Sequence, residues 1–138
     1  MEEGVFWESI NFATLKKLPV IFVCENNQYA IHSRLSDRQA NENISEKVKV
    51  HGLPVKVIDG NDVFGLYHYT SEIVEQMRTG SSGPVFVECS TCRWRGHVGP
   101  EEDFILDYRS QSEVEGWISR DPIRQLGDII GEGRRQVV

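Results

Sequence analysis

The sequence predicts an α/β fold in which a parallel sheet is flanked by helices. Three short apolar runs, residues 19–23, 55–58 and 85–89, are rich in valine, isoleucine and phenylalanine, which is typical of buried strands. A helical repeat of apolar residues over 63–77 separates the second run from the third. Because parallel strands need crossover connections, this alternation of strands and helices favours a parallel sheet.

The first two elements are predicted from apolar periodicity. Residues 2–17 form a helix in this prediction, because Phe6, Ile10 and Ala13 share one helical face. Residues 19–23 are apolar on both faces, which predicts a central strand covered by helices on both sides.

The next elements lead from this strand to the third one. Residues 30–37 are polar and have no period, so they predict a loop over the strand ends, and 40–50 predict a weak, highly charged helix. The strand at 55–58 ends in a polar turn at 59–62, whose side chains can cap the helix at 63–77.

The remainder of the chain is predicted to be a loop followed by helices. Residues 98–110 are acidic and irregular, which indicates a loop, and residues 111–138 form a helical C-terminal tail. Within this tail, Ser112 is expected to cap a short helix and Pro122 to occupy the first position of the last one. Residues 1–138 are therefore interpreted as a single α/β domain.

Composition excludes several classes of function. The chain has 138 residues and a formal net charge of -6, so its overall charge does not favour binding to nucleic acid or an anionic membrane. No apolar run approaches the roughly 20 residues of a membrane span. The expected location is the cytoplasm, with no membrane and no nucleic acid as partner.

The cysteines include a C-x-x-C pair, Cys89 and Cys92, which is compatible with a redox pair or half of a zinc site. However, Cys89 ends a predicted strand, and residues three apart in an extended chain point to opposite faces. No second pair of zinc ligands follows at suitable spacing. The favoured interpretation is that the cysteines are structural.

Oxygen-bearing side chains follow the first strand. Glu25, Asn26, Asn27 and Tyr29 stand where parallel sheets bind ligands, beyond the carboxyl ends of their strands. Amide and carbonyl oxygens are hard neutral ligands that suit magnesium or calcium. An ordinary polar turn after a strand is the alternative interpretation.

Basic side chains follow the third strand and are expected at the same edge of the sheet. Arg93 and Arg95 can bind phosphate, and His97 can transfer a proton at neutral pH. Solvated surface residues with ordinary ion pairs are the alternative.

Six segments of the sequence carry a resemblance to one known family: residues 3–13, 18–31, 59–63, 91–97, 108–109 and 121–123. They resemble the alpha subunits of thiamine-diphosphate-dependent 2-oxo acid dehydrogenases. These are the decarboxylating first components of the pyruvate, branched-chain and acetoin dehydrogenase complexes. The resemblance covers nearly the whole chain and corresponds to roughly the second half of that subunit.

The resemblance implies a partial thiamine-diphosphate-binding fold and assigns a role to five residues. Asn27 would close the cofactor motif with its side-chain oxygen on Mg²⁺, and the Tyr29 carbonyl would be a second metal ligand. Arg93 would contact the diphosphate, and Ile31 would also bind the cofactor. His97 would be the catalytic residue, lying near the thiazolium and helping to pass the acyl group onward.

The resemblance also implies a reaction and partners. The reaction would be the oxidative decarboxylation of a 2-oxo acid, or the cleavage of acetoin, with acyl transfer to lipoyl. The partners would be the beta subunit, in a heterotetramer, and a lipoyl-bearing acyltransferase.

Three departures from the family pattern bear on this interpretation. The Gly-Asp-Gly segment that opens the cofactor motif is expected just before Met1, so the carboxylate ligand of magnesium is absent from these residues. Cys92 stands where the family usually has tyrosine, and Val98 replaces a serine that some members phosphorylate. The alternative function is accordingly a truncated, non-catalytic piece that keeps the fold and a subunit-interaction surface.

Overall fold

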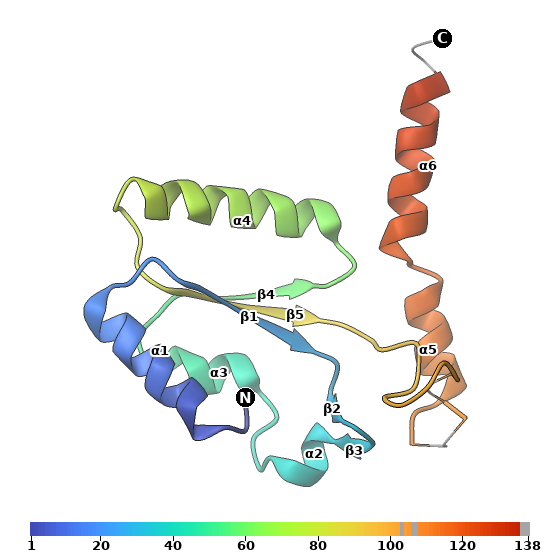
Figure 1. Ribbon diagram of the computed structural model, residues 1–138, viewed down its shortest axis with the longest axis horizontal. Coiled ribbons are helices and arrows are strands. Elements are labelled where there is room, and N and C mark those ends of the chain that lie inside the picture. Colours follow the sequence, from blue (N-terminus) through green and yellow to red (C-terminus); the bar gives the residue numbers. More distant parts are fainter. Residues whose placement is uncertain (103, 106–107, 136–138) are drawn as a thin grey trace.

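The computed structural model confirms the α/β fold with a parallel sheet (Figure 1). The strands are β1 (Ile21–Asn26), β4 (Val55–Asp59) and β5 (Val85–Ser90). They lie in the order β1-β5-β4, and both pairings are parallel. Each apolar run of the sequence therefore forms a strand, and all three strands end at the same edge of the sheet.

The structure describes residues 1–102, 104–105 and 108–135. The expected loop at 98–110 and the expected tail at 111–138 thus include six positions outside the described residues: 103, 106, 107 and 136–138. None of the described helices is long and apolar enough to cross a membrane.

Helices cover both faces of the sheet (Figure 1). On one face lie α1 (Gly4–Lys16) and α3 (Ile44–Lys49), and on the other lies α4 (Val63–Arg78). Successive residues of a strand point to opposite faces, so β5 contributes to two cores. The first core consists of Ile10, Leu35, Ile44, Val48, Leu53 and Phe86. The second consists of Ile58, Ile73, Val85, Val87 and Cys89.

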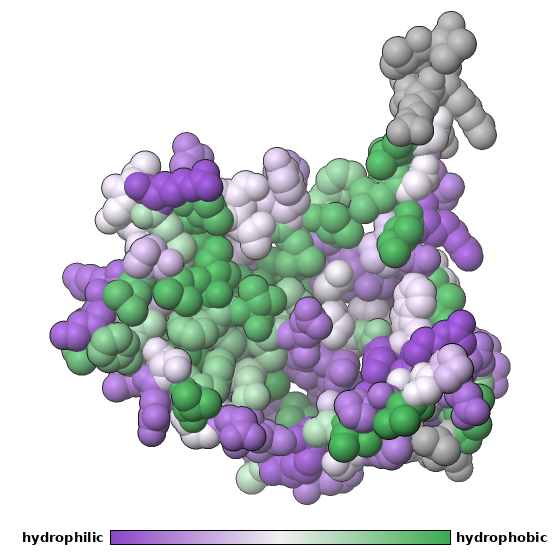
Figure 2. Space-filling model, in the orientation of Figure 1, coloured by the Kyte–Doolittle hydropathy of each residue, from purple (hydrophilic) through white to green (hydrophobic). Residues whose placement is uncertain are grey.

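Among the described strands β5 lies in the middle and β1 at one end, so the predicted central position of residues 19–23 is not observed within these residues. Val85 to Cys89 are all buried, whereas Val23 of β1 is 62% exposed. Figure 2 shows an apolar area along β1, between α4 and α1, where Ile21 and Met77 line a groove of about 480 Å³. The apolar run of residues 19–23 thus belongs to a strand at one end of the described sheet. A sequence that is apolar on both faces of a strand does not indicate which strands flank it.

The segment after β1 is more ordered than the predicted loop at 30–37. Two short strands, β2 (Tyr29–Ala30) and β3 (Ser33–Arg34), pair antiparallel, and α2 (Leu35–Arg38) follows at once. Leu35 is buried in the first core, which fixes this hairpin beside the strand ends. One apolar anchor in a polar segment carries too little periodicity to predict this structure.

Side-chain caps set the starts of two helices. Asn43 accepts a hydrogen bond from the Glu46 N–H, so α3 begins at Ile44 instead of near residue 40. The helix α5 (Gln111–Ile118) is capped by Ser110 and not, as expected, by Ser112. The last helix, α6 (Pro122–Arg135), starts at Pro122 as predicted and extends away from the sheet (Figure 1).

Candidate functional site

The turn that follows β1 is built by two asparagine side chains. Asn26 is buried, and its Oδ1 accepts a hydrogen bond of 3.0 Å from the Gln28 N–H. The Oδ1 of Asn27 accepts one of 2.9 Å from the Tyr29 N–H. Gln28 lies in the left-handed region, with φ 66°, which most side chains disfavour. Consecutive Asx turns thus hold Asn27 and Tyr29, the two residues expected to bind metal, in one tight turn.

Arg93 lies just after β5 and contacts two of the other predicted site residues, Ile31 and His97. Its Nη2 donates to the carbonyl of Ile31 at 2.9 Å, and its Nη1 lies 3.4 Å from the Nδ1 of His97. The same guanidinium donates to the Tyr108 hydroxyl at 2.7 Å. Since Ile31 follows Tyr29 by two residues, the structure brings Asn27, Tyr29, Ile31, Arg93 and His97 to one edge of the sheet.

A cavity of about 180 Å³ opens beside this turn. Asn27 and Tyr29 line it together with Cys24 and Arg38, whereas Arg93 and His97 lie outside its lining. The predicted metal ligands are therefore linked to Arg93 and His97 through Ile31, whose carbonyl accepts a hydrogen bond from Arg93. Burial, and to a smaller degree the negative charge of Glu88, raises the pKa of the Cys24 thiol to about 11. The thiol is therefore neutral and adds no charge to this wall of the cavity.

Sequence reasoning missed the residue that holds the site together, Arg109. Its side chain is 2% exposed, and its Nη2 donates to the Asn27 carbonyl at 2.9 Å. Its Nη1 donates to the Arg93 carbonyl at 3.1 Å and to the Cys92 Sγ at 3.0 Å. The guanidinium also lies 4.2 Å from the centre of the Tyr29 ring. Arg109 therefore ties the turn after β1 to the segment after β5.

The signal for Arg109 was present but weak. It belongs to one of the segments that carry the family resemblance, yet it lies in the irregular stretch predicted as a loop at 98–110. An arginine in such a stretch is predicted to be exposed, because arginine is almost never fully buried without partners. Two of its partners here are the main-chain carbonyls of Asn27 and Arg93, which no side-chain pattern reveals.

Two predicted features take other roles in the structure. Arg95 is exposed and donates to the Pro100 carbonyl at 3.2 Å, so it holds the loop at 95–102. No disulfide joins Cys89 and Cys92. Burial raises the pKa of Cys89, and Cys92 contacts Arg109, which fits the structural interpretation of both.

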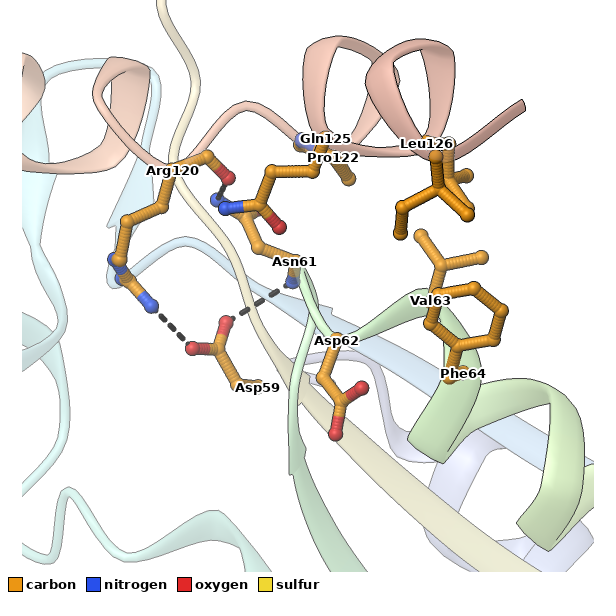
Figure 3. A pocket seen from close by; sticks show the side chains of 10 residues that line it. Asp59, Asn61, Asp62, Val63, Phe64, Arg120, Pro122, Gln125 and Leu126 are labelled. Atoms are coloured by element: carbon orange, nitrogen blue, oxygen red, sulfur yellow. Dashed lines mark hydrogen bonds and ion pairs between the residues drawn. The ribbon is translucent and has the colours of Figure 1, made fainter. Parts of the chain in front are cut away.

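A second cavity, of about 300 Å³, lies where α6 meets the start of α4 (Figure 3). Asn61 donates through Nδ2 to the Arg120 carbonyl at 2.9 Å, and Arg120 forms an ion pair with Asp59. Val63 and Leu126 form its apolar wall. None of the predicted site residues lines this cavity. The contacts of Arg120 with Asn61 and Asp59 join the C-terminal helices to the end of β4.

The Asp59 anchor predicts a pH dependence. The Asn61 N–H and the Arg120 guanidinium hold the pKa of Asp59 below its usual value of 3.8, against the opposing effect of burial. A lowered folded-state pKa stabilises the fold above the unfolded-state value, and this stabilisation is lost as the pH falls through the folded-state pKa. Asp59→Asn is therefore expected to lower the free energy of unfolding at pH 7 by less than about 1 kcal/mol, because the pair is exposed.

Urea unfolding between pH 7 and pH 2 measures this effect. The difference between the unsubstituted chain and Asp59→Asn should shrink below about pH 4. Asp128→Asn, which removes the same charge from exposed α6, is the matched control. A difference that stays constant down to pH 2 would contradict the role of the Asp59 charge.

Comparison with known proteins identifies the family. Residues 1–133 match the family model described as dehydrogenase E1 component. The chain belongs to this family. The resemblance found in the sequence is thereby confirmed, and the partial sheet is the part of an E1 component that the match covers.

Several curated relatives of this E1 chain are alpha subunits. It is 41% identical over 123 residues to the pyruvate dehydrogenase E1 component subunit alpha of Porphyra purpurea, covering 89% of this chain and 35% of the relative. It is 39% identical over 121 residues to the 2-oxoisovalerate dehydrogenase subunit alpha of Bacillus subtilis, covering 88% and 36%. It is 36% identical over 121 residues to the 3-methyl-2-oxobutanoate dehydrogenase subunit alpha of Mycobacterium tuberculosis, covering 88% and 32%. The chain thus spans about a third of the length of these relatives.

Proposed function

We propose that this E1 chain closes the thiamine diphosphate site of a 2-oxo acid dehydrogenase alpha subunit. The observation that carries the proposal is the pair of links across the sheet edge, from Arg93 to the Ile31 carbonyl and from Arg109 to the Asn27 carbonyl. These links set a cation beside a turn rich in neutral oxygen atoms. A metal diphosphate needs both kinds of partner.

The donor set fits the metal end of such a cofactor in part. Asn27 Oδ1 and the Tyr29 carbonyl are hard oxygen ligands of the kind that Mg²⁺ prefers. Asn27 Oδ1 accepts from Tyr29 N–H, so this oxygen is already held in place before a metal arrives. Within the described residues no group of three or more His, Cys, Asp or Glu side chains could hold a metal ion.

Arg93 and His97 have separate roles in this proposal. The guanidinium of Arg93 would neutralise diphosphate charge, and its bond to the Ile31 carbonyl would hold Ile31 where the cofactor binds. Arginine only donates hydrogen bonds, so the His97 Nδ1 that faces Arg93 must be the accepting nitrogen. The Nε2 of His97 is then the ring nitrogen that would exchange a proton with a reacting oxygen.

Thiamine diphosphate supplies the electron sink that allows a 2-oxo acid to lose carbon dioxide. The names of the relatives support a 2-oxo acid as substrate, with pyruvate and branched-chain acids both represented. We further propose a beta subunit and a lipoyl-bearing acyltransferase as partners, since the relatives are named as alpha subunits. Acetoin remains an alternative substrate, carried by the resemblance of the sequence.

A chimeric subunit tests the proposal. Residues 1–133 replace the matching segment of the Bacillus subtilis 2-oxoisovalerate dehydrogenase alpha subunit, which is produced together with its beta subunit. The chimera is expected to bind thiamine diphosphate in the presence of Mg²⁺, measured by titration calorimetry, and to release carbon dioxide from 2-oxoisovalerate or pyruvate. The native subunit pair is the control. A folded, assembled chimera that binds no thiamine diphosphate would refute the proposed function.

A further inference from the structure

Glu88 is a buried acid that the proposed function does not use. It lies on the central strand β5 and is 7% exposed. Its neighbours Val87 and Cys89 face the core under α4, so the Glu88 side chain faces the opposite side, with Phe86. A buried carboxyl group is costly unless hydrogen bonds satisfy it. Glu88 meets this need by accepting a hydrogen bond of 2.7 Å from the Asn26 Nδ2.

This bond fixes the orientation of the Asn26 side-chain amide. An ionised carboxylate only accepts hydrogen bonds, so the amide must turn its NH₂ group toward Glu88. The Asn26 oxygen is then left to face the Gln28 N–H, from which it accepts a bond of 3.0 Å. In the flipped orientation an oxygen would face the carboxylate and an NH₂ group would face the Gln28 N–H. Glu88 therefore excludes the amide orientation that would break the turn.

The Gln28 bond matters because the turn is strained. Gln28 has φ 66°, in the left-handed region, and the bond to Asn26 Oδ1 helps to hold it there. Asn27 and Tyr29 lie on either side of Gln28 and are joined to each other by the Asn27 Oδ1 bond. Their positions relative to the cavity beside the turn therefore depend on the conformation of Gln28.

We propose that Glu88 is a positioning residue for the cofactor site, which acts through the Asn26 amide to hold Asn27 and Tyr29 in their ligand geometry. This inference rests on the proposed function, because it assumes that the turn binds a metal diphosphate. Groups that orient metal ligands typically change metal affinity by about 10–100-fold when they are removed. Glu88 is expected to have an effect of this size without touching the cofactor.

Two measurements test the role of Glu88. Hydrogen exchange at the Gln28 N–H, followed by NMR in the 138-residue chain, reports on the turn itself, with the Thr91 N–H that donates to the Asn26 carbonyl as an internal reference. Titration of the chimeric subunit with thiamine diphosphate and Mg²⁺ reports on the site. Glu88→Met is expected to speed exchange at Gln28 by about tenfold relative to Thr91. It should weaken cofactor binding by about 10–100-fold.

Further variants distinguish an effect of Glu88 on the conformation of the turn from an effect on the overall stability of the protein. Glu88→Gln keeps an accepting oxygen and should stay close to the unsubstituted protein in both measurements. Val87→Ala, on the opposite face of the same strand, should lower stability without altering exchange at Gln28 relative to Thr91. Asn26→Asp should impair the turn because it sets two carboxylates together, and adding Glu88→Gln should restore it with donor and acceptor reversed.

The outcomes decide between the inference and the proposed function. Exchange at Gln28 that is no faster in Glu88→Met than in Val87→Ala would overturn the inference, as would unchanged cofactor affinity. If Glu88→Met does not fold, failure of Glu88→Gln to rescue Asn26→Asp overturns it instead. The proposed function fails separately, when the unsubstituted chimera does not bind thiamine diphosphate.

Discussion

Replacing Arg109 with methionine is expected to lower the free energy of unfolding by about 3 kcal/mol, a large effect for one side chain. Methionine fills a similar volume but donates no hydrogen bonds. The carbonyls of Asn27 and Arg93 would lose the guanidinium that now joins them. Hydrogen bonds to a charged group contribute about 1.5–3 kcal/mol each, and buried acceptors left without donors add their own cost. The loss should be concentrated in the two segments that Arg109 connects.

Urea unfolding and hydrogen exchange measure this prediction. Exchange should increase at residues 26–29 and 91–94 more than in α4. Arg109→Lys keeps the charge but offers a single ammonium instead of a planar fork, so it should recover only part of the stability. Arg120→Met, at an arginine whose side chain is 47% exposed, is the matched control. A loss below about 1 kcal/mol for Arg109→Met would contradict the central role of this residue.

Replacing Asn27 with alanine in the chimeric subunit is expected to weaken binding of magnesium thiamine diphosphate by more than about 100-fold. The substitution removes the proposed metal ligand, and it also removes the acceptor of the Tyr29 N–H, which shapes the second ligand. Both effects act on the metal end of the cofactor. The dependence of cofactor affinity on the concentration of Mg²⁺ should therefore weaken along with the affinity.

Calorimetric titrations at several Mg²⁺ concentrations make this measurement. Asn27→Asp keeps an oxygen at the same position and should bind much better than Asn27→Ala, since a carboxylate also accepts from the Tyr29 N–H. Asn11→Ala, on the exposed side of α1, is the control. Equal affinity in Asn27→Ala and Asn11→Ala would remove Asn27 from the metal site.

The helices and strands predicted most accurately are those in which apolar residues repeat with a regular period. The helix at 63–77 and the strand at 55–58 were found within one or two residues, because a repeating apolar face marks both. The helix predicted at 40–50 was too long, since charged residues give no period and the true start depends on one cap at Asn43. Boundaries set by a single hydrogen bond are the hardest to predict from sequence.

The sequence by itself determined the α/β fold, the three strands of the parallel sheet and the family, and it named the five residues expected at the site. It did so because apolar period and short motifs are local properties of the chain. Only the tertiary structure decided that β5 and not β1 is central among the described strands, and that Arg109 and Glu88 support the turn at Asn27. Both residues act across long separations in sequence, Arg109 on a main-chain carbonyl and Glu88 on one amide. Such contacts form only when the strand ends meet in space.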